Sequence, residues 1–223
     1  MNVFVLCTGR CGSTTFIKAC EHVTNFTAAH ESRLRMIGAS RMAYPRNHIE
    51  ADNRLSWIIG TLERVYGDRA HYVHLSRNRD ATAASLDNRR WSDARGMSMT
   101  LAYQKSFLLG GEEGEDPRKI SADLADVLTA NIEFFLRDKT NVHRVAVERA
   151  KEDFAAFWHW IGAEGDLDAA LAEWDVRYNP NPPPKTAYRR FRSVAGSALR
   201  AVGLRPRQTA FTSPKRRDPL WSR

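Results

Sequence analysis

Residues 2–16 read NVFVLCTGRCGSTTF: an apolar run, then a loop with two glycines, then a series of hydroxyl side chains. The run Asn2 to Cys7 hardly alternates between apolar and polar residues, as expected of a central parallel strand that is covered on both faces. Thr8 to Gly12 holds the two glycines and Arg10, and Ser13 to His22 is predicted to be a helix. The order strand, glycine loop and helix is typical of α/β proteins, in which ligands bind beyond the carboxyl ends of the strands.

The rest of the chain continues the alternation of strands and helices. Further strands are predicted at residues 25–29, 71–75 and 142–147. Helices are predicted at residues 53–66, 97–109 and 117–137 and after residue 147. Another helix is predicted to have Asp80 as its N-cap and to end near Trp91. We therefore predict a three-layer α/β domain: a mainly parallel central sheet with helices on both faces and a P-loop-like nucleotide site. The spacer Asn179 to Pro184 ends this domain, so its expected bounds are residues 1–184.

Polar and charged residues follow three of the predicted strands. They are Thr8–Arg10 after the first strand, His30–Glu31 after the second, and Ser76–Arg77 after the strand at 71–75. Because the carboxyl ends of parallel strands meet at one edge of a sheet, we expect these three segments to lie on one rim.

The length and the cysteines restrict the class of protein. A chain of 223 residues fits one domain. It has no apolar run of about 18 residues, and its apolar start is too short for a signal peptide, so we expect no transmembrane helix and no secretion. Cys7, Cys11 and Cys20 form no CxxC pair, which argues against a disulfide framework and a zinc ribbon. Cys7 and Cys20 are predicted to be reduced core residues, and we expect a cytoplasmic protein.

The positive charge of the chain is concentrated at its C-terminus. The whole chain carries +8, but residues 185–223 hold eleven Lys and Arg against one acid, so the remainder is nearly neutral. We expect a basic C-terminal tail over residues 185–223, amphipathic and helical in Lys185–Arg207 and disordered from Gly203 onward. Such a helix fits an anionic membrane surface, where the protein would be peripheral, or an acidic polymer. The alternative is a helix that packs its apolar face against the domain.

The glycine loop has the composition of an anion site. Glycines let the backbone wrap closely around an anion, and the first turn of the next helix points its free N–H groups and its positive dipole end toward it. Ser13, Thr14 and Thr15 add hydroxyl donors, and Arg10 adds a fixed positive charge. The loop is not a Walker A motif, because Ser13 stands where that motif has lysine. The alternative is a tight turn without a ligand.

A second candidate anion site follows the strand at residues 71–75. Arg77 comes directly after this strand, and Ser85 lies on the predicted helix that follows, near enough to share one phosphate. The alternative is that Arg77, together with Arg79, Arg89 and Arg90, belongs to a solvated basic face.

The two segments together resemble the sulfotransferases that use 3′-phosphoadenosine-5′-phosphosulfate (PAPS). The first loop of that family reads approximately [K/R]-x-G-[ST]-[ST], which Arg10-Cys11-Gly12-Ser13-Thr14 matches. Its second motif, R-N-P-x-D-x-x-x-S, is matched by Arg77, Asn78 and Ser85, although Arg79 replaces the proline and Asp80 stands one place early. The resemblance covers about 150 residues, from the first strand to Glu148, a span counted on the sequence.

The resemblance implies a division of the nucleotide between the two segments. Arg10, Cys11, Gly12, Ser13, Thr14 and Thr15 would bind the 5′-phosphosulfate, and Arg77 with Ser85 the 3′-phosphate. The C-terminal RKG motif of the cytosolic animal enzymes is absent, so what completes the 3′-phosphate site stays open, with Lys185 and Arg189 as candidates. The aromatic residues that would stack on adenine are not placed either.

Sulfuryl transfer depends on positioning and on stabilisation of charge, because the attacking and leaving oxygens lie in line in a loose transition state. Arg10 is suited to neutralise charge on the leaving phosphate. A hydroxyl acceptor also needs a general base, and the rim of the second strand offers Glu31 first and His30 second. Family members often carry a Glu or His at this place. The alternative assigns Glu31 to the N-terminus of a helix that starts at Ser32.

The sequence thus predicts transfer from PAPS, with 3′,5′-adenosine bisphosphate as the product, to a hydroxyl, or less readily an amine, of a carbohydrate or small-molecule acceptor. No metal is expected, since His48, Glu50 and Asp52 lack the spacing of a metal site. Residues 33–52 and 92–116 are the expected acceptor region. One alternative is a P-loop-type kinase or nucleotide hydrolase, which needs a Walker lysine. The other is a non-enzymatic nucleic-acid-binding module that uses the tail, which would leave Arg77 and Ser85 without a role, so we expect no nucleic-acid partner.

Overall fold

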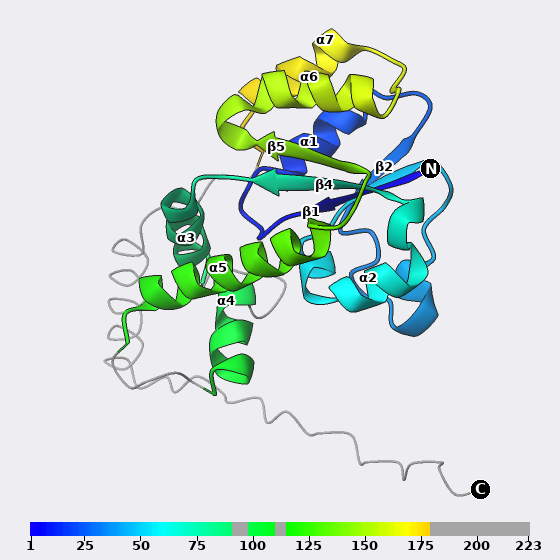
Figure 1. Cartoon of the computed structure of the whole chain (residues 1–223). Helices are drawn as coiled ribbons and strands as arrows, with labels where there is room; N and C mark the ends of the chain where they lie inside the picture. Colours follow the sequence, from blue (N-terminus) through cyan, green and yellow to red (C-terminus); the bar gives the residue numbers. More distant parts are fainter. Residues whose placement is uncertain (91–97, 110–114, 179–223) are drawn as a thin grey trace, which may run out of the picture. The chain divides into compact units, whose positions relative to one another are not determined.

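A computed structural model of the chain describes residues 1–90, 98–109 and 115–178. Five strands form one sheet, and every pair of neighbouring strands is parallel (Figure 1). The strands are β1 (Asn2–Leu6), β2 (Thr27–His30), β3 (His48–Ala51), β4 (His71–Ser76) and β5 (Val142–Ala146), in the order β2-β3-β1-β4-β5. The contacts within the chain divide it into Met1–Pro182 and Pro183–Arg223, and all described residues belong to the first unit.

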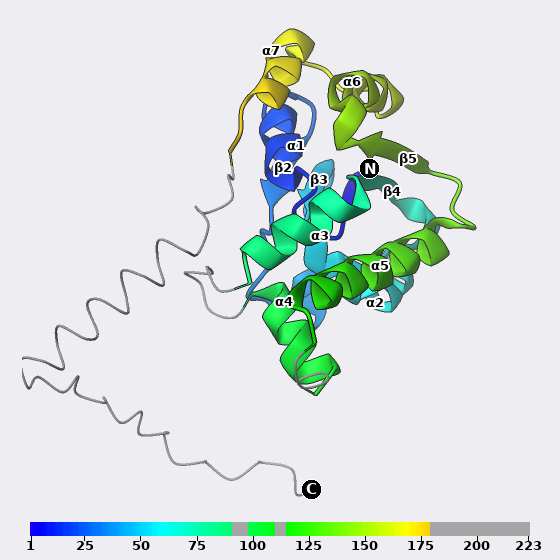
Figure 2. The same ribbon diagram turned by 90° about the vertical axis from the view of Figure 1, so that its left-hand side faces the viewer.

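Helices cover both faces of this sheet. They are α1 (Ser13–Cys20), α2 (Ile59–Val65), α3 (Arg79–Asn88), α4 (Met99–Ala102), α5 (Pro117–Leu136), α6 (Ala150–Trp160) and α7 (Leu167–Ala172). Short 3-10 turns lie at Gly38–Met42, Asn53–Trp57, Gly67–Arg69, Val147–Arg149 and Glu173–Asp175, and a π-helical turn at Tyr103–Phe107. Figures 1 and 2 show α1, α6 and α7 on one side of the sheet and α2 and α5 on the other. The predicted three-layer α/β fold with a parallel central sheet is therefore confirmed.

The side chains of β1 explain why its sequence is almost entirely apolar. Val3 and Val5 belong to the core cluster that contains Phe16 of α1, whereas Phe4 and Leu6 belong to the cluster on the opposite face. These four β1 side chains are fully buried. Since successive residues of a strand point to opposite faces, a strand between two helical layers needs apolar residues at every position.

β3 was not among the predicted strands. His48 and Glu50 alternate in it with Ile49 and Ala51, a pattern typical of a strand with one polar face, yet all four residues are buried. The Glu50 carboxylate accepts hydrogen bonds from the Ser32 backbone N–H at 2.7 Å and the Ser32 hydroxyl at 2.6 Å, and it lies 3.0 Å from His48 Nε2. A buried carboxylate is tolerated here because each of its oxygens has a polar partner.

Three details of the predicted helices need correction. Asn78, not Asp80, is the N-cap of α3: its side-chain oxygen accepts from the Ala81 N–H at 3.0 Å. α3 ends at Asn88, and Trp91 lies outside the described residues. The single helix predicted at 53–66 is a 3-10 turn followed by α2, with Ile58 between them in a non-helical conformation.

The predicted C-terminal segments lie outside the described residues. This applies to the spacer at residues 179–184 and to the basic tail at residues 185–223, including its amphipathic helix. In the part of the chain that the structure describes, no helix is long and apolar enough to cross a membrane.

Candidate functional site

The glycine loop between β1 and α1 has an unusual backbone. Gly9, Arg10 and Gly12 have φ angles of 81°, 62° and 85°, in the left-handed region that non-glycine residues rarely adopt. Gly12 is the N-cap residue of α1, and among the described residues no side chain caps this helix. A turn of this kind directs successive backbone N–H groups into one concavity, and an uncapped N-terminus leaves N–H groups free for an anion.

Arg10 connects the two candidate anion segments. Its Nε donates to the Ser85 hydroxyl at 3.0 Å, and the Arg77 guanidinium donates to the Arg10 carbonyl at 3.2 Å. Ser85 is buried on α3, while Arg77 is exposed after β4. The structure thus brings together residues about 70 positions apart, as the predicted rim required.

Positive charge accumulates around Arg10. The pKa of the Arg10 guanidinium is lowered to about 10, first by burial and then by the charges of Arg89, Arg77 and Arg177. Like charges gathered in this way are stabilised when an anion enters between them. Arg177 was not recognised in the sequence, because it lies 100 residues after Arg77 and outside any motif.

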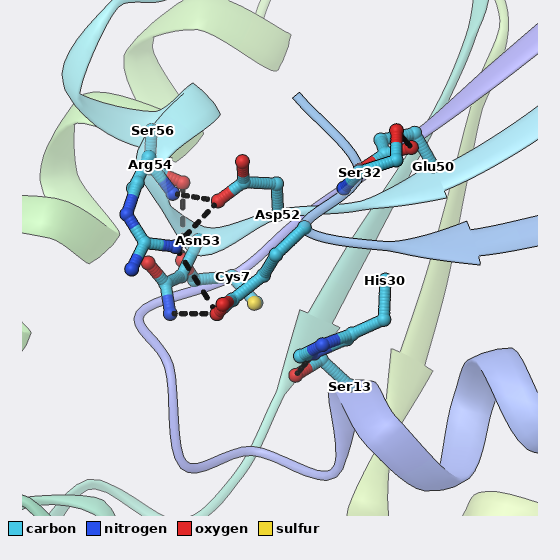
Figure 3. Close-up of polar contacts among 10 residues, drawn as sticks. Cys7, Ser13, His30, Ser32, Glu50, Asp52, Asn53, Arg54 and Ser56 are labelled. Atoms are coloured by element: carbon cyan, nitrogen blue, oxygen red, sulfur yellow. Dashed lines mark hydrogen bonds and ion pairs between the residues drawn. The ribbon is translucent and has the colours of Figure 1, made fainter. Parts of the chain in front are cut away.

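His30 contacts the residue that follows the glycine loop. It ends β2, and its Nε2 is 3.0 Å from the hydroxyl of Ser13, the first residue of α1 (Figure 3). His30 is half-buried. An imidazole nitrogen therefore lies within hydrogen-bond distance of a hydroxyl that belongs to the candidate anion loop.

Glu31 is held in a different way. Its Oε1 is 3.2 Å from Arg54 Nη1 and accepts a 3.4 Å hydrogen bond from Asn53 Nδ2. Arg54 also pairs with Asp52 at 3.3 Å, and Figure 3 shows Asp52, Asn53 and Arg54 gathered at the end of β3. Residues 32–35 form turns rather than a helix, so the alternative role of Glu31 at a helix N-terminus is wrong.

The remaining loop residues differ in what they can offer a ligand. Cys11 is fully buried, so its side chain is not exposed to a ligand. The Cys7 thiol hydrogen-bonds with Cys11, which raises the pKa of Cys7 and lowers that of Cys11. Thr14 and Thr15 are half-buried in the first turn of α1. Lys185 and Arg189 lie outside the described residues.

A pocket of about 300 Å³ lies beside these residues. Arg54, the ion-pair partner of Glu31, lines it, and so does Met99, whose methyl group would lie 3.4 Å from a Cβ placed on Gly9. Asp52 also lines it, and burial raises the pKa of that carboxyl. Most of the lining comes from residues 33–58, with Met99 and Ala102 from α4, so part of it lies in the expected acceptor region. Among the described residues, no group of three or more His, Cys, Asp or Glu side chains is placed to hold a metal ion.

Comparisons with known proteins agree with this architecture. No protein-family model and no curated protein matches the sequence. Among solved structures, the sulfotransferase domain from the curacin biosynthetic pathway is similar, with a TM-score of 0.52 and 14% identity over 87% of this chain and 96% of that domain. A mouse sulfotransferase complexed with PAP has a TM-score of 0.48 and 15% identity over 78% of this chain and 62% of its own. The likeness to the curacin domain shows that the chain has a sulfotransferase fold.

Proposed function

We propose that the chain is a sulfotransferase that moves a sulfuryl group from PAPS to a hydroxyl of a carbohydrate or small-molecule acceptor. The hydrogen bond between Arg10 and Ser85 carries this proposal, because it joins the glycine loop to the segment after β4. A nucleotide with phosphate groups at both its 3′ and 5′ positions needs two anion sites a short distance apart, and Arg10 lies between them. The sulfotransferase fold supports the same conclusion.

In this proposal the two ends of the nucleotide bind to different segments. The 5′-phosphosulfate lies on the N–H groups of Gly12 to Thr15, with the Ser13 hydroxyl and Arg10. The 3′-phosphate binds Arg77 and Ser85. Arg89 completes the 3′-phosphate site in place of the RKG motif, because it is close enough for its charge to act on Arg10. The mutual repulsion of these guanidiniums in the free protein is relieved when the nucleotide binds.

Arg10 would bind the 5′-phosphate and would also act as the reaction proceeds. Negative charge grows on the bridging oxygen of the 5′-phosphate as its bond to sulfur breaks, and a guanidinium beside it lowers the energy of that state. A buried, partly desolvated cation is more effective in this role than an exposed one.

Two residues compete for the role of general base. Glu31 is held by Arg54 and Asn53, whereas the His30 nitrogen faces Ser13 in the loop itself. Because His30 is in contact with the residue proposed to bind the sulfuryl end, we favour His30 as the group that takes the proton from the acceptor. Glu31 then positions Arg54 and Asn53 at the start of the loop.

Thermal stabilisation by nucleotides tests this function against its alternatives. A ligand at 100 times its Kd raises the free energy of unfolding by about 2.7 kcal/mol. We expect such a shift with 3′,5′-adenosine bisphosphate and little with ATP–Mg or an oligonucleotide. Arg77→Ala should remove most of the shift. Arg79→Ala is the matched control, because Arg79 pairs with Asp126 and Asp80 instead. A larger shift with ATP–Mg would favour a kinase, and one with the oligonucleotide a nucleic-acid-binding module.

A further inference from the structure

The pocket beside Glu31 has walls of two kinds. Aliphatic and aromatic side chains form most of it, among them Trp57, Ile58 and Met99. Arginines line it as well: Arg33, Arg41 and Arg54. A cavity with an apolar body and a few charged groups orients a ligand that has both characters.

The three arginines are not equivalent. Arg54 is neutralised by Glu31 and Asp52. Arg33 donates to the Ala43 carbonyl at 2.5 Å, and Arg41 donates to the Met36 carbonyl at 3.0 Å. Within residues 1–90, 98–109 and 115–178, neither Arg33 nor Arg41 forms an ion pair with a carboxylate. Both side chains are half-buried, so two guanidiniums at this pocket have only neutral partners.

Tyr44 adds a neutral donor beside them. Its ring lines the pocket, and the Arg33 guanidinium lies 5.7 Å from the ring centre. Its hydroxyl is buried and has no hydrogen-bond partner in the described part of the chain. Burial, together with the charges of Glu50 and Asp52, raises the pKa of Tyr44, so that the phenol keeps its proton and can only be neutral here.

Two lining residues connect the pocket with the surroundings of the glycine loop. Arg54 joins it to Glu31, and Met99 joins it to Gly9. A ligand in this pocket can therefore direct a hydroxyl toward the glycine loop while an anionic group contacts Arg33 and Arg41, which line the same pocket.

We infer that the acceptor is a hydroxylated organic acid, whose carboxylate or other anionic group binds Arg33 and Arg41 while its hydroxyl faces the glycine loop. This inference rests on the proposed sulfotransferase function. A lone pair of the acceptor oxygen forms the new bond to sulfur. The bond between sulfur and the bridging phosphate oxygen breaks, and its electron pair stays on 3′,5′-adenosine bisphosphate. The hydroxyl proton passes to His30.

The test compares acids with their neutral amides. The probes are para-hydroxyphenylacetate with its amide and ω-hydroxyhexanoate with its amide, titrated calorimetrically into protein saturated with 3′,5′-adenosine bisphosphate. We expect the acid of at least one pair to bind about tenfold more tightly than its amide, because a carboxylate forms a charge-assisted hydrogen bond with a guanidinium. Arg33→Gln combined with Arg41→Gln should abolish this difference. Arg35→Gln, an exposed arginine of the same segment that does not line the pocket, should keep it.

Nucleotide binding separates this inference from the function on which it rests. If the double variant keeps parental stabilisation by 3′,5′-adenosine bisphosphate and loses the preference for acids, the inference holds. Equal affinity for acid and amide in the parent protein, or no binding of either pair, overturns it even when the nucleotide binds. Failure of the parent protein to bind the nucleotide at all would instead overturn the proposed function.

Discussion

The carboxyl ends of β1 and β4 differ in their electrostatics from those of β2 and β3. At the first pair, the guanidiniums of Arg10, Arg77 and Arg89 lie close enough to affect one another, and the pKa of Arg10 falls to about 10. At the second pair, the carboxylates of Glu31 and Glu50 each have partners within the protein, namely Arg54 in one case and Ser32 in the other.

This difference distinguishes a region suited to bind a ligand from a region that stabilises the fold. A cluster of like charges is less favourable in the free protein than with a bound ligand of opposite charge. A paired carboxylate is already stabilised and contributes to the fold. Substitutions at the carboxyl ends of β1 and β4 should therefore change the affinity for the ligand more than the free energy of unfolding. A substitution of Glu50 should have the reverse effect. His30 lies at the boundary, because it is on β2 but contacts Ser13 of the loop.

The largest expected effect concerns the base at this boundary. If His30 takes the acceptor's proton, His30→Asn should lower turnover by about 10²- to 10⁴-fold, the usual contribution of general base catalysis, with affinity for the nucleotide unchanged. Steady-state rates of 3′,5′-adenosine bisphosphate release measure the turnover, and calorimetric titration measures the affinity.

Glu31→Gln is the comparison variant, since it keeps the shape of the side chain and loses the charge. Glu31→Gln should lower turnover less than His30→Asn does. The reverse ranking would return the role of base to Glu31, the first choice from the sequence. Near-parental turnover in both variants, with nucleotide binding intact, would place the base elsewhere.

A second prediction contrasts the two edges in stability. Removing the carboxylate in Glu50→Ala leaves the Ser32 N–H and hydroxyl without their acceptor, and should lower the free energy of unfolding by about 3 to 5 kcal/mol. Arg10→Gly should cost less, because the lost hydrogen bond to Ser85 is offset by the preference of glycine for the left-handed backbone of this position. Urea unfolding of both variants gives the comparison.

Ligand binding should show the opposite ranking. The Glu50 variant, at a temperature where it is folded, should keep its affinity for the nucleotide, whereas Arg10→Gly should lose most of it. Glu164→Ala, an exposed carboxylate, controls for the loss of charge. Equal destabilisation by the Glu50 and Arg10 substitutions would remove the distinction between the two edges.

The sequence was sufficient to predict the central strand β1 and the edge of the sheet at which the polar segments meet. Its apolar strand and glycine loop predicted a central parallel strand, and the alternation of elements placed His30 and Arg77 on the same edge of the sheet. Such features depend on local order along the chain, which a single sequence records well. The contact between Arg10 and Ser85 was not predicted, since the sequence placed them in separate anion sites.

Features that depend on partners far away in the sequence could not be predicted. β3 was missed because Glu50 looks like a surface residue until Ser32 and His48 are placed around its carboxylate. The cap of α3 was assigned to Asp80 because both Asn78 and Asp80 are good capping residues, and only the backbone decides between them. The pocket proposed for the acceptor combines residues 33–58 with α4, so its shape has no signature in either segment.

The central claim is that two segments of the chain bind the two ends of one nucleotide. Its most direct test is calorimetric titration of the parent protein and Arg77→Ala with 3′,5′-adenosine bisphosphate and with 5′-AMP, which lacks the 3′-phosphate. The parent should bind the bisphosphate much more tightly, and Arg77→Ala should lose about 2 to 4 kcal/mol of that preference, as expected for a charge-assisted contact with phosphate. Equal affinity of the parent protein for the two nucleotides would contradict the claim.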